Sequence, residues 1–160
     1  MSEFERLRDI VAQLRGEHGC PWDREQTHAS LKATCIEEAA EVIGGINILT
    51  DTGNPDNLRE ELGDLLLQVV MNAQIAEEEG FFTMDDVSRT VSDKLVRRHP
   101  HVFGDSEYTS PEEAKKRWDE IKKTEKDGRE WEQEYLPAAM DEAKQLIDVA
   151  KKRKGFAVKD

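Results

Sequence analysis

Two short stretches of the sequence each carry a pair of carboxylates three residues apart. Glu38 and Glu41 form the first pair, and Glu61 and Asp64 form the second. Side chains at this spacing meet on one face of an α-helix. If both stretches are helical and pack together, four carboxylates converge, and their mutual repulsion requires a counter-charge. Oxygen ligands favour a hard divalent cation, so the sequence predicts a site for Mg²⁺, with Mn²⁺ as a substitute.

Helical phase places each carboxylate pair at the edge of an apolar stripe. The first stripe contains Leu31, Cys35, Ala39, Val42, Ile43, Ile46 and Leu49. The second contains Leu58, Leu62, Leu65, Val69, Ala73 and Ala76. Glu38 lies at the edge of the first stripe and Glu41 slightly further round the helix, whereas Glu37 is expected to point outward. The phase therefore predicts different roles for the adjacent residues Glu37 and Glu38.

Other interpretations of the acids remain open. Glu-rich helices are common, and such a pattern is also typical of a solvated face. A carboxylate di-iron bundle would need a His three residues after a ligating Glu, and none follows Glu38 or Glu61 at that spacing. The chain could also be a non-catalytic helical interaction module with an acidic face. Such a module has no need for both carboxylate pairs, which favours a metal site.

Composition limits the remaining function classes. The chain has 160 residues, enough for one domain, with 36% charged residues and a net charge of −12. This charge argues against a nucleic-acid binder, which normally carries a basic face. No apolar run reaches membrane-spanning length, so we expect neither a membrane span nor a signal peptide. Cys20 and Cys35 form no disulfide framework or zinc motif, so we expect a reduced, cytoplasmic protein.

Apolar periodicity, capping residues and helix breakers predict an all-α bundle. The first expected helix follows Ser2, the second runs from about Ser30 to Leu49, and the third starts at Pro55 after an Asn54 cap. The fourth runs from Thr83 to His99, and the fifth starts at Pro111 after a Ser110 cap and ends before Gly128. The sixth runs from near Pro137 to Gly155. Gly19 and Pro21 are expected to interrupt the pattern at residues 18–28, and the CPWD loop at 20–23 is interpreted as structural support or a lid. Two interior glycines, Gly44 and Gly45, indicate close helix packing or a bend.

Beyond the acids, long strings of the sequence resemble the MazG family of nucleoside triphosphate pyrophosphohydrolases. The E-E-x-x-E pattern at 37–41 and the E-x-x-D pattern at 61–64 both resemble that family. Further similar segments occur in the same order: CPWDREQTHASLK at 20–32, KLVRRHPHVFGD at 94–105, WDEIKKTEK at 118–126 and LPAAMDEAKQLIDVAKKRKGF at 136–156. The resemblance covers about residues 7–156, so residues 1–160 are interpreted as a single MazG-like domain. Ala33 departs from the family pattern, in which many members have Pro.

The resemblance implies a specific activity and ligand set. MazG proteins are all-α, Mg²⁺-dependent enzymes that split a nucleoside triphosphate between its α and β phosphates, leaving a monophosphate and pyrophosphate. By this resemblance, Glu38, Glu41, Glu61 and Asp64 are the catalytic metal ligands. A nucleotide-pool, house-cleaning role is implied. A substrate-specialised relative acting on dUTP or phosphoribosyl-ATP with the same acids is the alternative.

The resemblance also assigns a cationic stretch and two residues near the nucleotide. Lys94, Arg97 and Arg98 are expected to contact the phosphates, and Trp118 and Lys122 to lie near the bound nucleotide. Cations at a helix C-terminus also complement the helix dipole, and Trp118 could belong to the core. In so acidic a chain, three clustered cations favour the phosphate-binding interpretation.

The helix that follows Asp64 is apolar almost all round. Leu67, Met71 and Ile75 lie on a face away from the main stripe. A helix that is apolar on every face is usually buried, and one small bundle would have difficulty covering both faces. The sequence therefore predicts at least a homodimer that packs through this helix, and the MazG resemblance also implies dimers.

Overall fold

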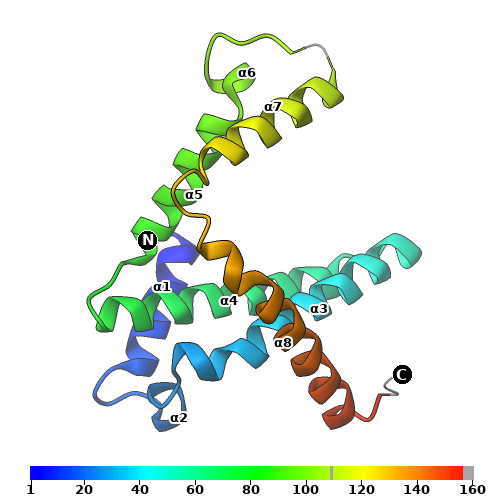
Figure 1. The fold of residues 1–160 in the computed structure, drawn as a ribbon. Coiled ribbons are helices and arrows are strands. Elements are labelled where there is room, and N and C mark those ends of the chain that lie inside the picture. The colour runs from blue at the N-terminus through cyan, green and yellow to red at the C-terminus, as the bar shows by residue number, and fades with distance from the viewer. Residues whose placement is uncertain (109, 157–160) are drawn as a thin grey trace. The chain divides into compact units, whose positions relative to one another are not determined.

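The computed structural model describes residues 1–108 and 110–156, which contain helices and connecting segments but no strand (Figure 1). The prediction of an all-α fold is confirmed. The helices are α1 (Glu3–Arg15), α2 (Pro21–Arg24), α3 (His28–Thr52), α4 (Asp56–Glu78), α5 (Met84–Arg98), α6 (Pro100–Phe103), α7 (Pro111–Thr124) and α8 (Glu132–Arg153). No helix in the described part of the chain is long and apolar enough to cross a bilayer.

Local capping chemistry sets the starts of the long helices. Ser2 caps α1, as predicted, and it does so through a capping box with Glu5. α3 begins earlier than predicted, because Thr27 and Ser30 form a reciprocal capping box at its N-terminus. The predicted cap of α4 was wrong by one position. Pro55 is the cap, and the Asn54 side chain accepts a hydrogen bond from the backbone N–H of Asp56 at 2.9 Å.

Two short helices, α2 and α6, were not predicted. Each has a proline at its first position, where the missing N–H costs no intrahelical bond. The predicted start of α8 was also wrong, because Pro137 lies inside the helix rather than at its beginning. The residue four positions before Pro137 is Gln133, so the hydrogen bond that proline cannot donate is lost near the helix end.

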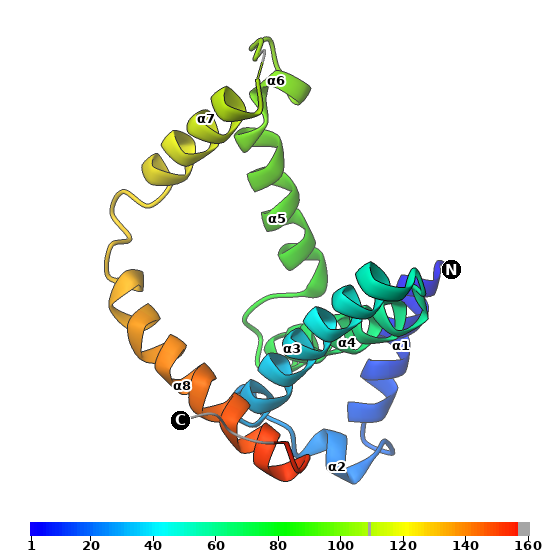
Figure 2. The ribbon, with the colours of Figure 1, turned by 90° about the vertical axis from the view of Figure 1, so that its right-hand side faces the viewer.

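The chain divides into two compact units, and α3 and α4 form the centre of the first, which contains residues 1–84 and 140–156. Figures 1 and 2 show these two helices side by side, running in opposite directions. α1 also packs against α4. The buried apolar residues are Val11, Leu31, Val70, Met71, Ala73, Ile75, Ala76 and Met84. Most of them belong to the C-terminal half of α4.

α3 and α4 approach each other closely at Gly45. A Cβ atom there would lie only 2.8 Å from the Cα atom of Leu58. A Cβ atom added at Gly44 would have no atom within 4 Å other than those of neighbouring residues and the backbone of the same helix. The prediction of close helix packing at the glycine pair is therefore confirmed, and it applies to Gly45.

The predicted apolar stripes were only partly right. Ile43 and Leu62, assigned to the core, are 61% and 50% exposed in this chain. Met71 and Ile75, assigned to a free face, are only 5% and 3% exposed. The reason is tertiary, because the first unit packs α1 as well as α3 against α4 and so buries a second face of α4.

A buried arginine anchors the segment before α3. The Arg15 side chain is 6% exposed and pairs with Glu78 of α4 at 2.7 Å. It also donates hydrogen bonds to the backbone carbonyls of Asp23 at 2.6 Å and Gln26 at 3.1 Å. The hydrogen bond from Arg15 lowers the pKa of Glu78. This arginine therefore fixes the CPWD segment to α4 and gives it a structural role.

The second unit comprises Asp85–Ala139 and is described separately from the first. It contains nearly all of α5, the short α6, all of α7 and the N-terminal part of α8. α5 ends at Arg98, immediately before His99 and Pro100, as predicted. Ser110 caps α7, also as predicted, but the helix ends at Thr124, before the expected stop at Gly128.

Candidate metal site and cationic cluster

Three of the four predicted metal ligands converge at the α3–α4 contact. Glu38 of α3 and Glu61 and Asp64 of α4 each offer a carboxylate oxygen, and these oxygens lie within 4.8 Å of one another. Two ligands of one Mg²⁺, each at ~2.1 Å, can lie at most about 4.2 Å apart. Small side-chain rotations would therefore bring all three oxygens to one ion.

The electrostatics of this acid cluster also fit a cation. Burial raises the pKa of Glu38, and the nearby charges of Asp64, Glu37 and Glu61 raise it further. The ionised form of Glu38 is therefore disfavoured when no cation is bound. A hard divalent ion would reverse that penalty, and an all-oxygen donor set suits Mg²⁺ or Mn²⁺.

Asn57 supports the cluster and was not identified from the sequence. Its side-chain amide donates a hydrogen bond of 2.8 Å to the Glu61 carboxylate. Asn57 lies one helical turn before Glu61, and this i, i+4 spacing is the signal that could have indicated the contact. The bond fixes the direction of the Glu61 carboxylate toward the other acids.

Glu41, the fourth predicted ligand, lies outside the group formed by Glu38, Glu61 and Asp64. Its carboxylate instead forms an ion pair with Lys154, the residue that follows α8. The side chain of Glu41 is 33% exposed, so its carboxylate remains accessible. Because Glu41 lies one turn after Glu38 on α3, it remains a proposed ligand.

The prediction that Glu37 points outward was wrong. Its side chain is only 15% exposed, and it accepts hydrogen bonds from Arg153 at 2.6 Å and from Lys154 at 2.9 Å. The hydrogen bond from Lys154 is the largest cause of the lowered pKa of Glu37. Figures 1 and 2 show the C-terminal part of α8 crossing α3. No local pattern could have indicated this contact, because more than 110 residues separate the partners.

In the second unit, three of the predicted nucleotide-binding residues come together. Arg98 pairs with Glu125 at 2.6 Å, and Arg97 pairs with the same carboxylate at 3.0 Å. The guanidinium carbon of Arg98 lies 4.9 Å from the centre of the Trp118 ring, a cation–π distance. Hydrogen bonds from Arg98 and then Arg97 lower the pKa of Glu125. These contacts hold α5 and the C-terminal end of α7 together.

The other two predicted nucleotide-binding residues are less constrained. Within residues 1–108 and 110–156, neither Lys94 nor Lys122 forms a hydrogen bond or ion pair through its side chain. Lys94 is half-buried on α5, and Lys122 is exposed on α7. Both ammonium groups are therefore available to a ligand.

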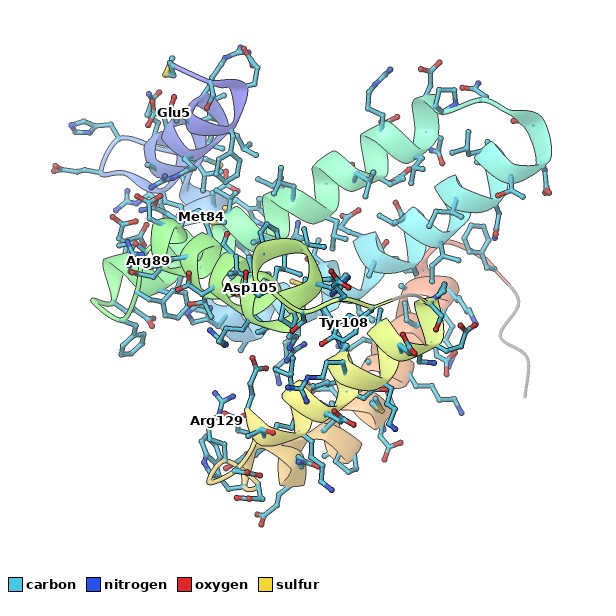
Figure 3. The ribbon with its side chains drawn as sticks, turned by 90° about the horizontal axis from the view of Figure 1, so that it is seen from above. Glu5, Met84, Arg89, Asp105, Tyr108 and Arg129 are labelled. Carbon is cyan, nitrogen blue, oxygen red and sulfur yellow. The ribbon has the colours of Figure 1, made fainter. Side chains whose placement is uncertain are left out.

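His99, the residue that caps the short helix α6, packs beside Trp118. The His99 ring lies 4.9 Å from Trp118, and the His101 ring lies 4.9 Å from the ring of Tyr108. Tyr108, which Figure 3 labels, belongs to the segment before α7. His99, His101 and Trp118 line a hollow of about 520 Å³. Trp118 is half-buried, so part of its ring packs in this cluster and part remains accessible.

Part of the chain matches a known protein family. Residues 26–103 match the MazG nucleotide pyrophosphohydrolase domain. The chain is 54% identical over 123 residues to the nucleoside triphosphate pyrophosphohydrolase/pyrophosphatase MazG of Thermotoga maritima, an alignment that covers 77% of this chain and 45% of that protein. It is 47% identical over 127 residues to a nucleoside triphosphate pyrophosphohydrolase of Escherichia coli K12, covering 79% of this chain and 47% of the relative.

A further relative is the uncharacterized protein YabN of Bacillus subtilis, 49% identical over 128 residues, which cover 80% of this chain and 25% of YabN. The alignments therefore span from about a quarter to about half of the length of these relatives. The matched domain contains all four predicted metal ligands as well as Lys94, Arg97 and Arg98. The chain belongs to the MazG nucleotide pyrophosphohydrolase family.

Proposed function

We propose that residues 1–160 act as one MazG-like domain, a Mg²⁺-dependent nucleoside triphosphate pyrophosphohydrolase. The reaction cleaves between the α and β phosphates and yields a nucleoside monophosphate and pyrophosphate, in a house-cleaning role in the cytoplasm. The observation that carries this proposal is the convergence of Glu38, Glu61 and Asp64 from two helices. Two of the relatives described above are named for this class of activity.

The acids have distinct parts in the proposed chemistry. Glu38, Glu61 and Asp64 would hold Mg²⁺ or Mn²⁺, with Glu41 as the fourth ligand, and Asn57 would keep Glu61 oriented. When bound, the ion neutralises the triphosphate, polarises a phosphoryl oxygen and lowers the pKa of an attacking water. Such hydrolysis depends mainly on positioning and charge stabilisation, so no nucleophilic Ser or Cys is required.

The cationic residues of the second unit are proposed to bind the nucleotide. Lys94, Arg97 and Arg98 would neutralise phosphate oxygens, which a chain of net charge −12 needs in order to attract an anionic substrate. Glu125 and Trp118 hold the Arg98 guanidinium in one orientation, which reduces the entropy lost on binding. Trp118 would contact the nucleotide through its accessible part, with Lys122 on the same helix.

The products of the reaction test this proposal directly. The protein would be incubated with Mg²⁺ and each member of a panel made up of nucleoside triphosphates, including dUTP, and phosphoribosyl-ATP. Chromatography should then resolve a monophosphate and pyrophosphate as the primary products. EDTA should abolish turnover, and Mn²⁺ should restore it. A diphosphate with inorganic phosphate would contradict the cleavage position. Turnover of one panel member alone would favour a substrate-specialised enzyme, and no turnover of any would favour the interaction module.

We also propose that the protein forms a homodimer through α3 and α4. The large side chains exposed on these two helices include Ile43, Ile46, Leu62, Leu66 and Val69. On each helix the members are three or four residues apart, so they lie along one face. These residues replace Met71 and Ile75, which are buried within the chain, as the expected contact surface.

The assembly can be tested by light scattering at micromolar concentration. The wild-type chain is expected to have the mass of a dimer or a larger assembly, and Leu66→Glu is expected to lower that mass, because a charge at the contact surface would be buried. Val149→Glu is the matched control, since Val149 is also exposed but lies on α8. A stable wild-type monomer would contradict the proposal, as would equal effects of both substitutions.

A further inference from the structure

Two cations at the end of α8 lie against the acids of α3. The Lys154 ammonium contacts the carboxylates of both Glu37, at 2.9 Å, and Glu41. The Arg153 guanidinium contacts Glu37 at 2.6 Å. Glu41 is a proposed metal ligand, one turn from Glu38, so Lys154 already contributes positive charge to the proposed metal site.

An ammonium group and a divalent cation compete for the same carboxylate. Both are attracted by the charge of Glu41, and each repels the other at such short range. While Lys154 remains in place, it partly neutralises the site and weakens the attraction for Mg²⁺. When the ion occupies the site, the electrostatic attraction between Lys154 and Glu41 is largely cancelled by the repulsion between Lys154 and the ion.

The position of Lys154 in the chain allows it to move. It directly follows the last residue of α8 and precedes Gly155, which has a φ angle of 76°. Its side chain is 36% exposed, so its departure would open no buried cavity. Helix ends fray readily, and the separation of Lys154 from α3 would not break the body of α8.

We propose that Lys154 is a tethered counter-ion, which Mg²⁺ displaces from Glu41, so that metal binding loosens the C-terminal end of α8, which stays paired with Glu37. The inference rests on the proposed role of Glu41 in metal binding. The coupling is reciprocal: if the metal weakens the contact of Lys154 with Glu41, removal of Lys154 strengthens metal binding by the same factor.

Calorimetric titration with Mg²⁺ alone tests the counter-ion. Lys154→Gln should bind Mg²⁺ about fivefold more tightly than the wild type, or more, at the low end of typical coupling factors. Lys152→Gln is the matched control, because Lys152 is exposed and lies two residues before Lys154, so the substitution removes the same charge. The control should change the affinity less than about twofold, since exposed charges at longer range are screened by salt. Equal effects of the two substitutions would overturn the proposal.

Hydrogen exchange supplies a second readout. Near the end of α8, the backbone N–H groups of Lys154, Gly155 and Phe156 donate to the carbonyls of Ala150, Lys152 and Lys151. Mg²⁺ should speed the exchange of these amides in the wild type and have little effect in Lys154→Gln, where the contact is already absent. Slower or unchanged exchange of the wild type with Mg²⁺ would overturn the loosening of the α8 end.

The same titration separates the two proposals. If the wild-type chain binds no Mg²⁺, the metal site of the proposed function fails, and the counter-ion role fails with it. If the wild type binds Mg²⁺ but Lys154→Gln and Lys152→Gln behave alike, only the counter-ion role is overturned.

Discussion

Replacement of Glu38 by Gln should lower kcat/KM at saturating Mg²⁺ at least ~100-fold, which corresponds to about 2.7 kcal/mol of activation free energy. Glutamine keeps the shape of the side chain but removes a charged ligand from the group that Glu38 forms with Glu61 and Asp64. Because the bound ion assists the chemical step itself, the loss should appear in kcat and not only in KM.

Glu37→Gln is the matched control, since it removes the same charge from the adjacent residue. Glu37 lies outside the group of converging acids and is paired with Arg153 and Lys154. Its replacement should therefore reduce kcat/KM much less, by under about tenfold, or 1.4 kcal/mol. Equal losses in the two variants would show that the assignment of Glu38 as the ligand and Glu37 as a partner of α8 is wrong.

Thermal melting of the same variants in EDTA should separate them in the opposite order. The pKa of Glu38 is raised, so its charge opposes folding at neutral pH, and Glu38→Gln should be at least as stable as the wild type. The pKa of Glu37 is lowered, so this carboxylate adds stability above its unfolded pKa, and that stability is lost as the pH falls through the folded value. Glu37→Gln should therefore melt at a lower temperature than the wild type near pH 7. The difference should vanish at a pH low enough to protonate Glu37 of the wild type in both its folded and its unfolded state.

Gly45→Ala should destabilise the protein by about 1–3 kcal/mol, the usual cost of overpacking. The added Cβ would lie 2.8 Å from the Cα atom of Leu58 and 3.1 Å from its backbone nitrogen. Main-chain atoms cannot rotate away, so α3 and α4 would have to separate. Because the same two helices carry Glu38 and the pair Glu61 and Asp64, kcat/KM should fall as well.

Gly44→Ala is the control for helix propensity. Apart from neighbouring residues and the backbone of the same helix, no atom lies within 4 Å of the Cβ that it would add. Alanine favours a helix interior over glycine by up to about 1 kcal/mol. Urea unfolding at one protein concentration should therefore show opposite signs for Gly44→Ala and Gly45→Ala. Stabilisation by Gly45→Ala would mean that the close approach of α3 to α4 does not exist.

The sequence by itself determined the features that depend on neighbouring residues in the chain. Ser2 and Ser110 cap their helices, Pro100 marks the end of α5, and the i, i+3 spacing puts Glu61 and Asp64 on one face of α4. Helical geometry fixes these relations, because residues three or four apart share a face whatever surrounds the helix.

Only the tertiary structure decided which partner each face receives. The burial of Met71 and Ile75 depends on packing around α4, and the burial of Glu37 depends on a return of α8 to α3 after more than 110 residues. Likewise, Arg97 and Arg98 meet Glu125 of the α7 C-terminus. Periodicity identifies the residues that share a face, but burial and charge pairing depend on contacts between distant segments, which leave no periodic signal in the sequence.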